Sequence, residues 1–140
     1  MQTASRRRHG AGFTLIELMI VVAVIAILAA IAYASYSHYL IKTRRNAAAV
    51  CLQERAQYLE RYYTTNMTYL GVSDPAACDT VSDFYTLSYS VTPTATAYTI
   101  QAVPVSGSAQ AKDTTCGTLT INQAGVRTAN GSTSLASECW

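Results

Sequence analysis

The chain opens with a short polar and basic segment that gives way abruptly to a long apolar one. Residues 1–12 are small, polar or basic and show no hydrophobic periodicity. Residues 13–34 are almost wholly apolar, and Glu17 is their one charged residue. As a helix, about 22 residues rising about 1.5 Å each would extend about 33 Å, enough to cross a bilayer core. We therefore expect a cleaved leader over 1–12 and a transmembrane helix segment over 13–34.

The helical pattern continues beyond the apolar run but becomes one-sided. No proline or glycine appears between Ser35 and Gly71, so one long helix is predicted. Over residues 35–63, apolar residues recur at spacings of three and four, which places them on one stripe. The expected stripe is Ala48, Leu52, Ala56, Leu59 and Tyr63, and the residues expected largely off it are Arg45, Gln53, Glu54 and Glu60. This amphipathic helix half needs a partner surface.

The rest of the chain, residues 64–140, predicts a β-rich globular part. Residues 64–83 are rich in turn-forming residues and read as a connecting loop. Apolar and polar residues then alternate over 85–91 and 98–102, on either side of a Thr-Pro-Thr-Ala turn, which predicts a hairpin. Its expected inner face is Tyr85, Leu87, Tyr89, Val91, Tyr98, Ile100 and Ala102.

Two further strands complete the expected sheet. Leu119 and Ile121 alternate with threonines within residues 117–122, and a fourth strand is expected near Val126. A small antiparallel sheet must cover its apolar face, and the helical stripe is the amphipathic surface available for it. The predicted fold class is α+β, a long N-terminal helix packed on a small antiparallel β-sheet.

The net charge changes once the leader is set aside. The formal charge of +2 includes the leader's three arginines, Arg6, Arg7 and Arg8. Without residues 1–12, seven Lys and Arg stand against eight Asp and Glu, so the sum is 7 − 8 = −1. This balance argues against a general nucleic-acid binder.

The four cysteines favour disulfides. Cys51, Cys78, Cys116 and Cys139 lie far apart, without the C-x-x-C spacing that supplies two zinc ligands. An even count in an exported chain indicates an oxidising compartment, and four cysteines allow three connectivities. We expect no metal and no cofactor.

The run Gly12-Phe13-Thr14-Leu15-Ile16-Glu17-Leu18 resembles the N-terminus of type IV pilins. The resemblance implies that a prepilin peptidase cuts after Gly12 and N-methylates Phe13. A carboxylate inside an apolar helix costs several kcal/mol unless it is paired. The resemblance implies that Glu17 pairs with the α-amino group of Phe13 on a neighbouring subunit during assembly. Ala26 and Ala34 stand where pilins usually have glycine and proline, so we expect an unbroken helix there.

A second resemblance covers the C-terminal half. The run from Cys116 to Gly125, with the closing Cys139-Trp140, is similar to PilE-type minor pilins, which sit in or initiate a fibre beside a more abundant subunit. It implies a disulfide between Cys116 and Cys139. Cys51 and Cys78 would then bond to each other, or remain buried free thiols.

The resemblances imply a structural subunit of a type IV pilus, supporting pilus biogenesis, adhesion and twitching motility, and not an enzyme. They imply storage in the bacterial inner membrane, followed by export into an extracellular pilus. The implied partners are the prepilin peptidase, other pilin subunits in a homo- or hetero-filament, and the inner-membrane assembly machinery.

Three alternatives stay open. One is a type II secretion pseudopilin, which shares the same N-terminus. Another is a pilin whose exposed domain binds DNA or another ligand, with phosphate contacts from Lys42, Arg44, Arg45, Arg55 and Arg61. The third treats the apolar run as a plain membrane anchor, or as a secretory signal cut at the small-residue sites between Ala30 and Ala34.

Overall fold

The computed structural model describes residues 12–140 apart from residues 74, 76 and 77. The predicted leader therefore lies outside the described residues, except for Gly12. The chain divides into a first unit that ends at Ser37 and a second unit, His38–Trp140. We call the second unit the head and describe the two separately.

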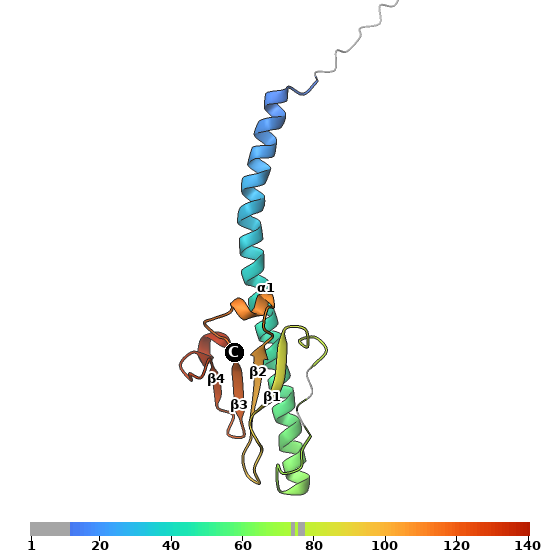
Figure 1. Ribbon diagram of the computed structural model, residues 1–140, viewed down its shortest axis with the longest axis vertical. Helices are drawn as coiled ribbons and strands as arrows, with labels where there is room; N and C mark the ends of the chain where they lie inside the picture. Colours follow the sequence, from blue (N-terminus) through green and yellow to red (C-terminus); the bar gives the residue numbers. More distant parts are fainter. Residues whose placement is uncertain (1–11, 74, 76–77) are drawn as a thin grey trace, which may run out of the picture. The chain divides into compact units, whose positions relative to one another are not determined.

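The first unit is the beginning of helix α1 (Leu15–Asn66). The helix runs without a break through Ala26 and Ala34 (Figure 1), as expected from the absence of glycine and proline. All described residues of this unit are exposed, and its large apolar side chains are between 47% (Val21) and 78% (Tyr33) exposed. Among the described residues, α1 is the one helix long and apolar enough to cross a membrane, with a window of mean hydropathy 3.0.

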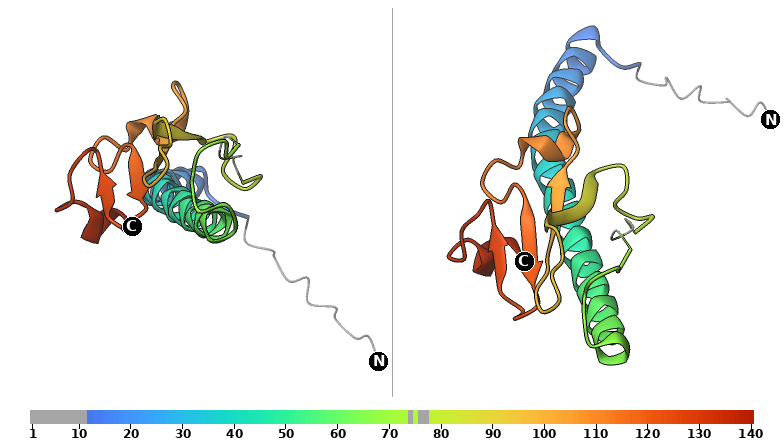
Figure 2. Two further views of the ribbon diagram at one scale, coloured as in Figure 1. Left: turned by 90° about the horizontal axis from the view of Figure 1, so that it is seen from below. Right: turned by 60° about the horizontal axis from the view of Figure 1, so that its bottom comes forward.

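The head contains a four-stranded antiparallel sheet. Its strands are β1 (Tyr85–Val91), β2 (Thr99–Pro104), β3 (Leu119–Asn122) and β4 (Arg127–Ala129), in the order β1-β2-β3-β4. Each strand pairs with the next along the chain, and the C-terminal half of α1 lies along one face of the sheet (Figure 2). The predicted α+β architecture is confirmed.

The predicted helical stripe forms one wall of the core. Ala48 and Leu52 are fully buried, Leu59 is 1% exposed, and Tyr63 at the end of the stripe is half-buried. Opposite them lie the buried sheet residues Tyr85, Leu87, Ile100, Ala102, Leu119, Ile121 and Ala129. Burying a leucine or isoleucine side chain contributes about 1.5–3 kcal/mol, so this contact holds helix and sheet together.

The inner face of β1 ends sooner than its alternation predicts. Tyr85 and Leu87 are buried, but Tyr89 is only half-buried and Val91 is 65% exposed. The pairing register with β2 shifts between Tyr89 and Val91, and an irregularity of this kind turns the following side chain to the other face. The expectation that Val91 faces the core was therefore wrong.

Two short helices were not expected from the sequence. The 3₁₀ helix η1 (Ala109–Lys112) and the helix α2 (Ala136–Cys139) each form a single turn. A buried Gln110 anchors η1, and a buried Cys139 anchors α2. Neither segment is long enough to show a helical period in its sequence.

Candidate functional site

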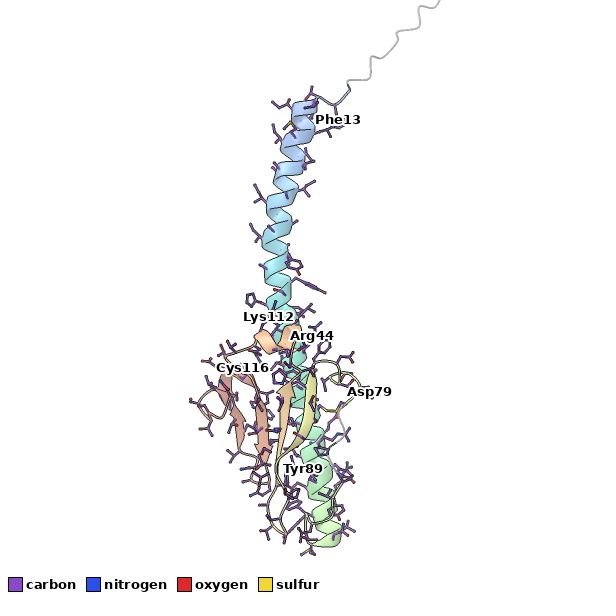
Figure 3. All side chains as sticks on the ribbon, in the orientation of Figure 1. Phe13, Arg44, Asp79, Tyr89, Lys112 and Cys116 are labelled. Carbon is purple, nitrogen blue, oxygen red and sulfur yellow. A yellow bond between two sulfur atoms is a disulfide. The ribbon has the colours of Figure 1, made fainter. Side chains whose placement is uncertain are left out.

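A threonine that was not singled out from the sequence caps the N-terminal end of α1. Thr14 directly precedes the helix, and its Oγ1 accepts a hydrogen bond from the backbone N–H of Glu17 at 3.3 Å. Its carbonyl oxygen accepts from the N–H of Leu18 at 3.2 Å. Thr14 is thus the N-cap, and Glu17 stands at the third helical position, as in a capping box. Phe13 therefore lies at the N-terminal end of the helix, which Figure 3 shows.

The first turn carries the single charge of the apolar segment. Glu17 is the one Asp, Glu, Lys or Arg between Phe13 and Ile41 in the sequence. Its negative charge lies near the positive end of the helix dipole, which favours it modestly. The neighbouring side chains Leu15, Ile16, Leu18 and Met19 are between 54% and 76% exposed. Apolar surface on this scale requires lipid or other protein chains as a covering.

The disulfide implied between Cys116 and Cys139 is present, and of the two possibilities left for Cys51 and Cys78 the structure has the bond. Cys116 is bonded to Cys139, with Cα atoms 5.5 Å apart, and Cys51 is bonded to Cys78, with Cα atoms 6.0 Å apart. The first bond fixes α2 beside the start of β3. The second joins α1 to the connecting loop.

Two tyrosines tie loops of the head to the helix through one carboxylate. Tyr69 Oη donates to both carboxylate oxygens of Glu60 at 3.1 Å, and Tyr98 Oη donates to Oε1 at 3.0 Å. Tyr69 stacks on Tyr63 with ring centroids 4.6 Å apart. Burial, followed by the hydrogen bond to Glu60, raises the pKa of Tyr69 to about 12, and the same causes raise the pKa of Tyr98 further.

A second polar cluster is buried where η1 meets α1. Gln110 Nε2 donates to Tyr85 Oη at 2.8 Å and to the Ile41 carbonyl oxygen at 3.2 Å. Arg45 Nη1 forms an ion pair with Asp113 Oδ2 at 2.7 Å, although Arg45 was expected to lie off the buried stripe. Burial, followed by the charge of Asp113, raises the pKa of Tyr85 to about 12.

Three of the five basic residues proposed for phosphate contacts are already engaged. Arg45 is held in its ion pair, and the Arg44 guanidinium lies 3.8 Å from the ring centroid of Phe84. Arg55 is half-buried, with its Nη2 3.8 Å from the Sγ of Cys78. Lys42 and Arg61 are exposed.

A groove of about 510 Å³ runs between α1 and the β3–β4 hairpin. Its helical side carries Gln53, Gln57, Glu60 and Arg61, and its hairpin side carries Asn122, Gln123, Gly125 and Arg127. Ala56, Tyr98 and Ile121 contribute buried side chains to its lining. We call it the helix–hairpin groove. Arg61 was named from the sequence and Arg127 was not, because the expectation of a strand near Val126 does not show that an arginine beside it lines a groove with α1.

Comparison with protein families gave two matches. Residues 34–120 match the family described as "Type IV minor pilin ComP, DNA uptake sequence receptor", and residues 7–33 match the "Prokaryotic N-terminal methylation motif". The second match contains Gly12, Phe13 and Glu17. Comparison with curated protein sequences gave no match.

Solved structures agree with the family matches. A type IV pilin from Shewanella oneidensis is 30% identical over 71% of this chain and 97% of that chain, with a TM-score of 0.54. The non-core minor pilin PilV of Neisseria meningitidis is 22% identical over 67% of this chain and 90% of that chain, with a TM-score of 0.55. This second similarity supports the fold assignment alone. The family model spans most of the chain, and the structure has the fold of these relatives, so this chain belongs to the type IV pilins, among the minor pilins of the ComP family.

Proposed function

We propose that this minor pilin is stored in the inner membrane through residues 13–34 of its N-terminal segment, is cut after Gly12 and is N-methylated on Phe13. It then leaves the membrane and joins an extracellular pilus together with other pilin subunits. The prepilin peptidase and the inner-membrane assembly machinery are the partners of these steps. The match to the N-terminal methylation motif supports the proposal. The role is structural and not catalytic; adhesion and twitching motility are properties of the whole fibre.

One observation carries the assembly mechanism. The segment of α1 from Leu15 to Ser37 is exposed and apolar, and its one charge, Glu17, lies one helical turn from Phe13. Cleavage after Gly12 would create a cation on Phe13 in the same apolar layer as this anion. Within a fibre, the Phe13 amine of one subunit would pair with Glu17 of its neighbour and set the axial register between them, because an unpaired charge in that layer is costly.

The test must separate this pairing from helix capping, because the Glu17 N–H is bonded to the N-cap Thr14 and Glu17 occupies the position of the acid in a capping box. Glu17→Gln keeps a side chain suited to the capping position but removes the charge. We expect Glu17→Gln and Glu17→Ala to be inserted and cleaved normally and to be strongly depleted from sheared pili. The measurement is the ratio of this subunit in the pilus fraction to that in the membrane fraction.

The control is Thr14→Ala, which removes the cap and keeps the charge. If Thr14→Ala is depleted as strongly as Glu17→Gln, or if Glu17→Gln is incorporated normally, Glu17 does not act through its charge. The N-terminal mass of the pilus form tests the cleavage itself. A chain that begins with methylated Phe13 supports it, and one that begins near Ser35 would overturn the whole proposal.

A second candidate function is DNA binding by the head. The ComP family is described as a receptor for a DNA uptake sequence, and its match covers residues 34–120. Lys42, Arg61 and Arg127 are exposed in the head and can reach phosphate groups. Electrophoretic retardation of duplex DNA by the full chain in non-ionic detergent tests this function. Binding that weakens with added salt is expected, and no retardation even at low salt contradicts it.

A further inference from the structure

We propose that the helix–hairpin groove binds one phosphodiester strand of DNA, which Arg61 and Arg127 contact from opposite sides of the groove. The inference rests on the proposed DNA-binding function and assigns it a location. His38–Trp140 contains seven basic and seven acidic residues, so the head as a whole has no excess positive charge. Affinity for a polyanion must therefore come from a local arrangement of donors.

The two arginines are placed to receive a charged ligand. Arg61 lies on the helical side of the groove and Arg127 on the hairpin side, and both are exposed. The described residues form a single ion pair, between Arg45 and Asp113. Neither groove arginine therefore has a carboxylate partner among the described residues. An unpaired guanidinium at a concave surface is a strong donor to phosphate oxygens.

Arg127 is also held in position. Its guanidinium lies 5.2 Å from the ring centroid of Trp140, within the range of a cation–π interaction. The Trp140 ring is itself fixed, because its Nε1 donates to the Thr128 carbonyl oxygen at 3.0 Å. An arginine ordered in advance loses less side-chain entropy when it binds a ligand.

Two amide side chains of the hairpin, Asn122 and Gln123, line the groove and accept backbone hydrogen bonds through their oxygens. Asn122 Oδ1 accepts from the backbone N–H groups of Ala124 and Val126, both at 3.0 Å, and Gln123 Oε1 accepts from that of Tyr98 at 3.3 Å. The Asn122 oxygen is engaged within the turn and the Gln123 oxygen by Tyr98, so the groups these side chains can still offer a ligand are their NH₂ groups. An NH₂ group is a donor, which suits phosphate oxygens.

Among the described residues, Glu60 is the one acid that lines the groove. Both of its oxygens already accept hydrogen bonds from tyrosines, Oε1 from Tyr69 and Tyr98 and Oε2 from Tyr69. These bonds hold the carboxylate in the tyrosine cluster, and within the described residues it forms no ion pair with either arginine. The remaining polar residues on the helical side, Gln53 and Gln57, are neutral.

The test measures the salt dependence of DNA affinity for the full chain in non-ionic detergent, with Arg61→Gln, Arg127→Gln and the double variant. The matched control is Lys112→Gln, which removes one exposed charge from η1, at the opposite end of the sheet from the β3–β4 turn (Figure 1). Arg6, Arg7 and Arg8, if retained, contribute equally to every variant. Circular dichroism confirms that each variant keeps its fold.

Each groove variant should lower the slope of log affinity against log salt by about one, and weaken binding about five- to tenfold at about 0.1 M salt. Lys112→Gln should change affinity less than about twofold, since it lies outside the groove. Single-stranded DNA should show the same losses as duplex DNA, because the groove grips one strand. If the wild-type chain binds DNA and the groove variants behave like Lys112→Gln, the groove is wrong while the DNA-binding function stands. If the wild-type chain binds no DNA at low salt, the function and the groove assignment both fail.

Discussion

Arg45 on α1 and Asp113 after η1 form an ion pair across 68 residues of sequence, with Nη1 and Oδ2 2.7 Å apart and side-chain exposures of 12% and 7%. Gln110 donates to the same Oδ2 at 3.5 Å and to the Tyr85 hydroxyl. The helix, the first strand and the loop between β2 and β3 are therefore joined by one buried polar cluster. This cluster lies at the end of the head where α1 enters it.

Removing one partner of this pair should destabilise the head strongly. We expect Asp113→Ala to lower the free energy of unfolding by about 3–5 kcal/mol, because it leaves the Arg45 guanidinium buried without a partner. Arg45→Met combined with Asp113→Leu should lower the free energy of unfolding much less, since no charge is then buried without a partner. Chemical denaturation of the three chains in detergent measures the difference. Equal losses in the single and double variants would contradict this account.

The head should lose stability in alkaline solution. The pKa values of Tyr69 and Tyr85 are raised from about 10 in the unfolded chain to about 12 in the folded one. A group whose pKa is raised by folding stabilises the fold fully below its unfolded pKa and ceases to do so as pH rises through its folded pKa. Unfolding free energy should therefore fall between about pH 10 and pH 12. Tyr69→Phe should reduce the pH dependence, and an unchanged profile would count against a titrating Tyr69.

The C-terminal disulfide should contribute a large share of the stability of the head. Cys116 and Cys139 are 23 residues apart, and closing a loop of this size stabilises a fold by about 3–4 kcal/mol in the chain-entropy model. Replacing both cysteines with serine should lower the midpoint of thermal unfolding by many degrees. Reducing the wild-type chain should bring its midpoint toward that of the variant. A variant that unfolds at the wild-type temperature would show that the bond constrains little.

Removing the negative charge of Glu60 should affect DNA binding in the opposite direction to removing a groove arginine. Glu60→Gln keeps an acceptor for the hydroxyls of Tyr69 and Tyr98 but removes the negative charge beside Arg61. If a phosphodiester strand lies in the groove, this change should strengthen DNA binding severalfold in the same titration. Glu54→Gln, on the same helix but outside the lining of this groove, is the matched control. Weaker binding by Glu60→Gln would argue against phosphate as the ligand.

The long-range order of the fold follows from two simple periodicities. The spacing of three and four from Ala48 to Leu59 predicted the buried helical face, and the alternation from Tyr98 to Ala102 predicted the central strand. Both succeed because burial on one face is what the pattern encodes. The alternation at Val91 failed because a local irregularity in strand pairing, which sequence does not display, ended it.

The polar sites were less predictable, because each depends on residues that meet only in the folded chain. Arg45 looked like a solvated helix residue until η1 placed Asp113 beside it. Arg127 adjoins a strand that the sequence predicted near Val126, but only the folded chain shows that it lines the groove that also contains Arg61. The capping role of Thr14 could have been predicted from the sequence, because a threonine three residues before a glutamate at the start of an apolar run is a capping signal.

The two disulfides also determine how the head would transmit a pulling force. Tension applied between the N-terminal part of α1 and the end of the chain would pass through the bond between Cys51 and Cys78 and through the bond between Cys116 and Cys139. The chain segments enclosed by these bonds would carry no load. Only the stretch between Cys78 and Cys116, which holds β1 and β2, could be drawn out in the head beyond the helix, so covalent topology limits how far a stretched subunit can extend.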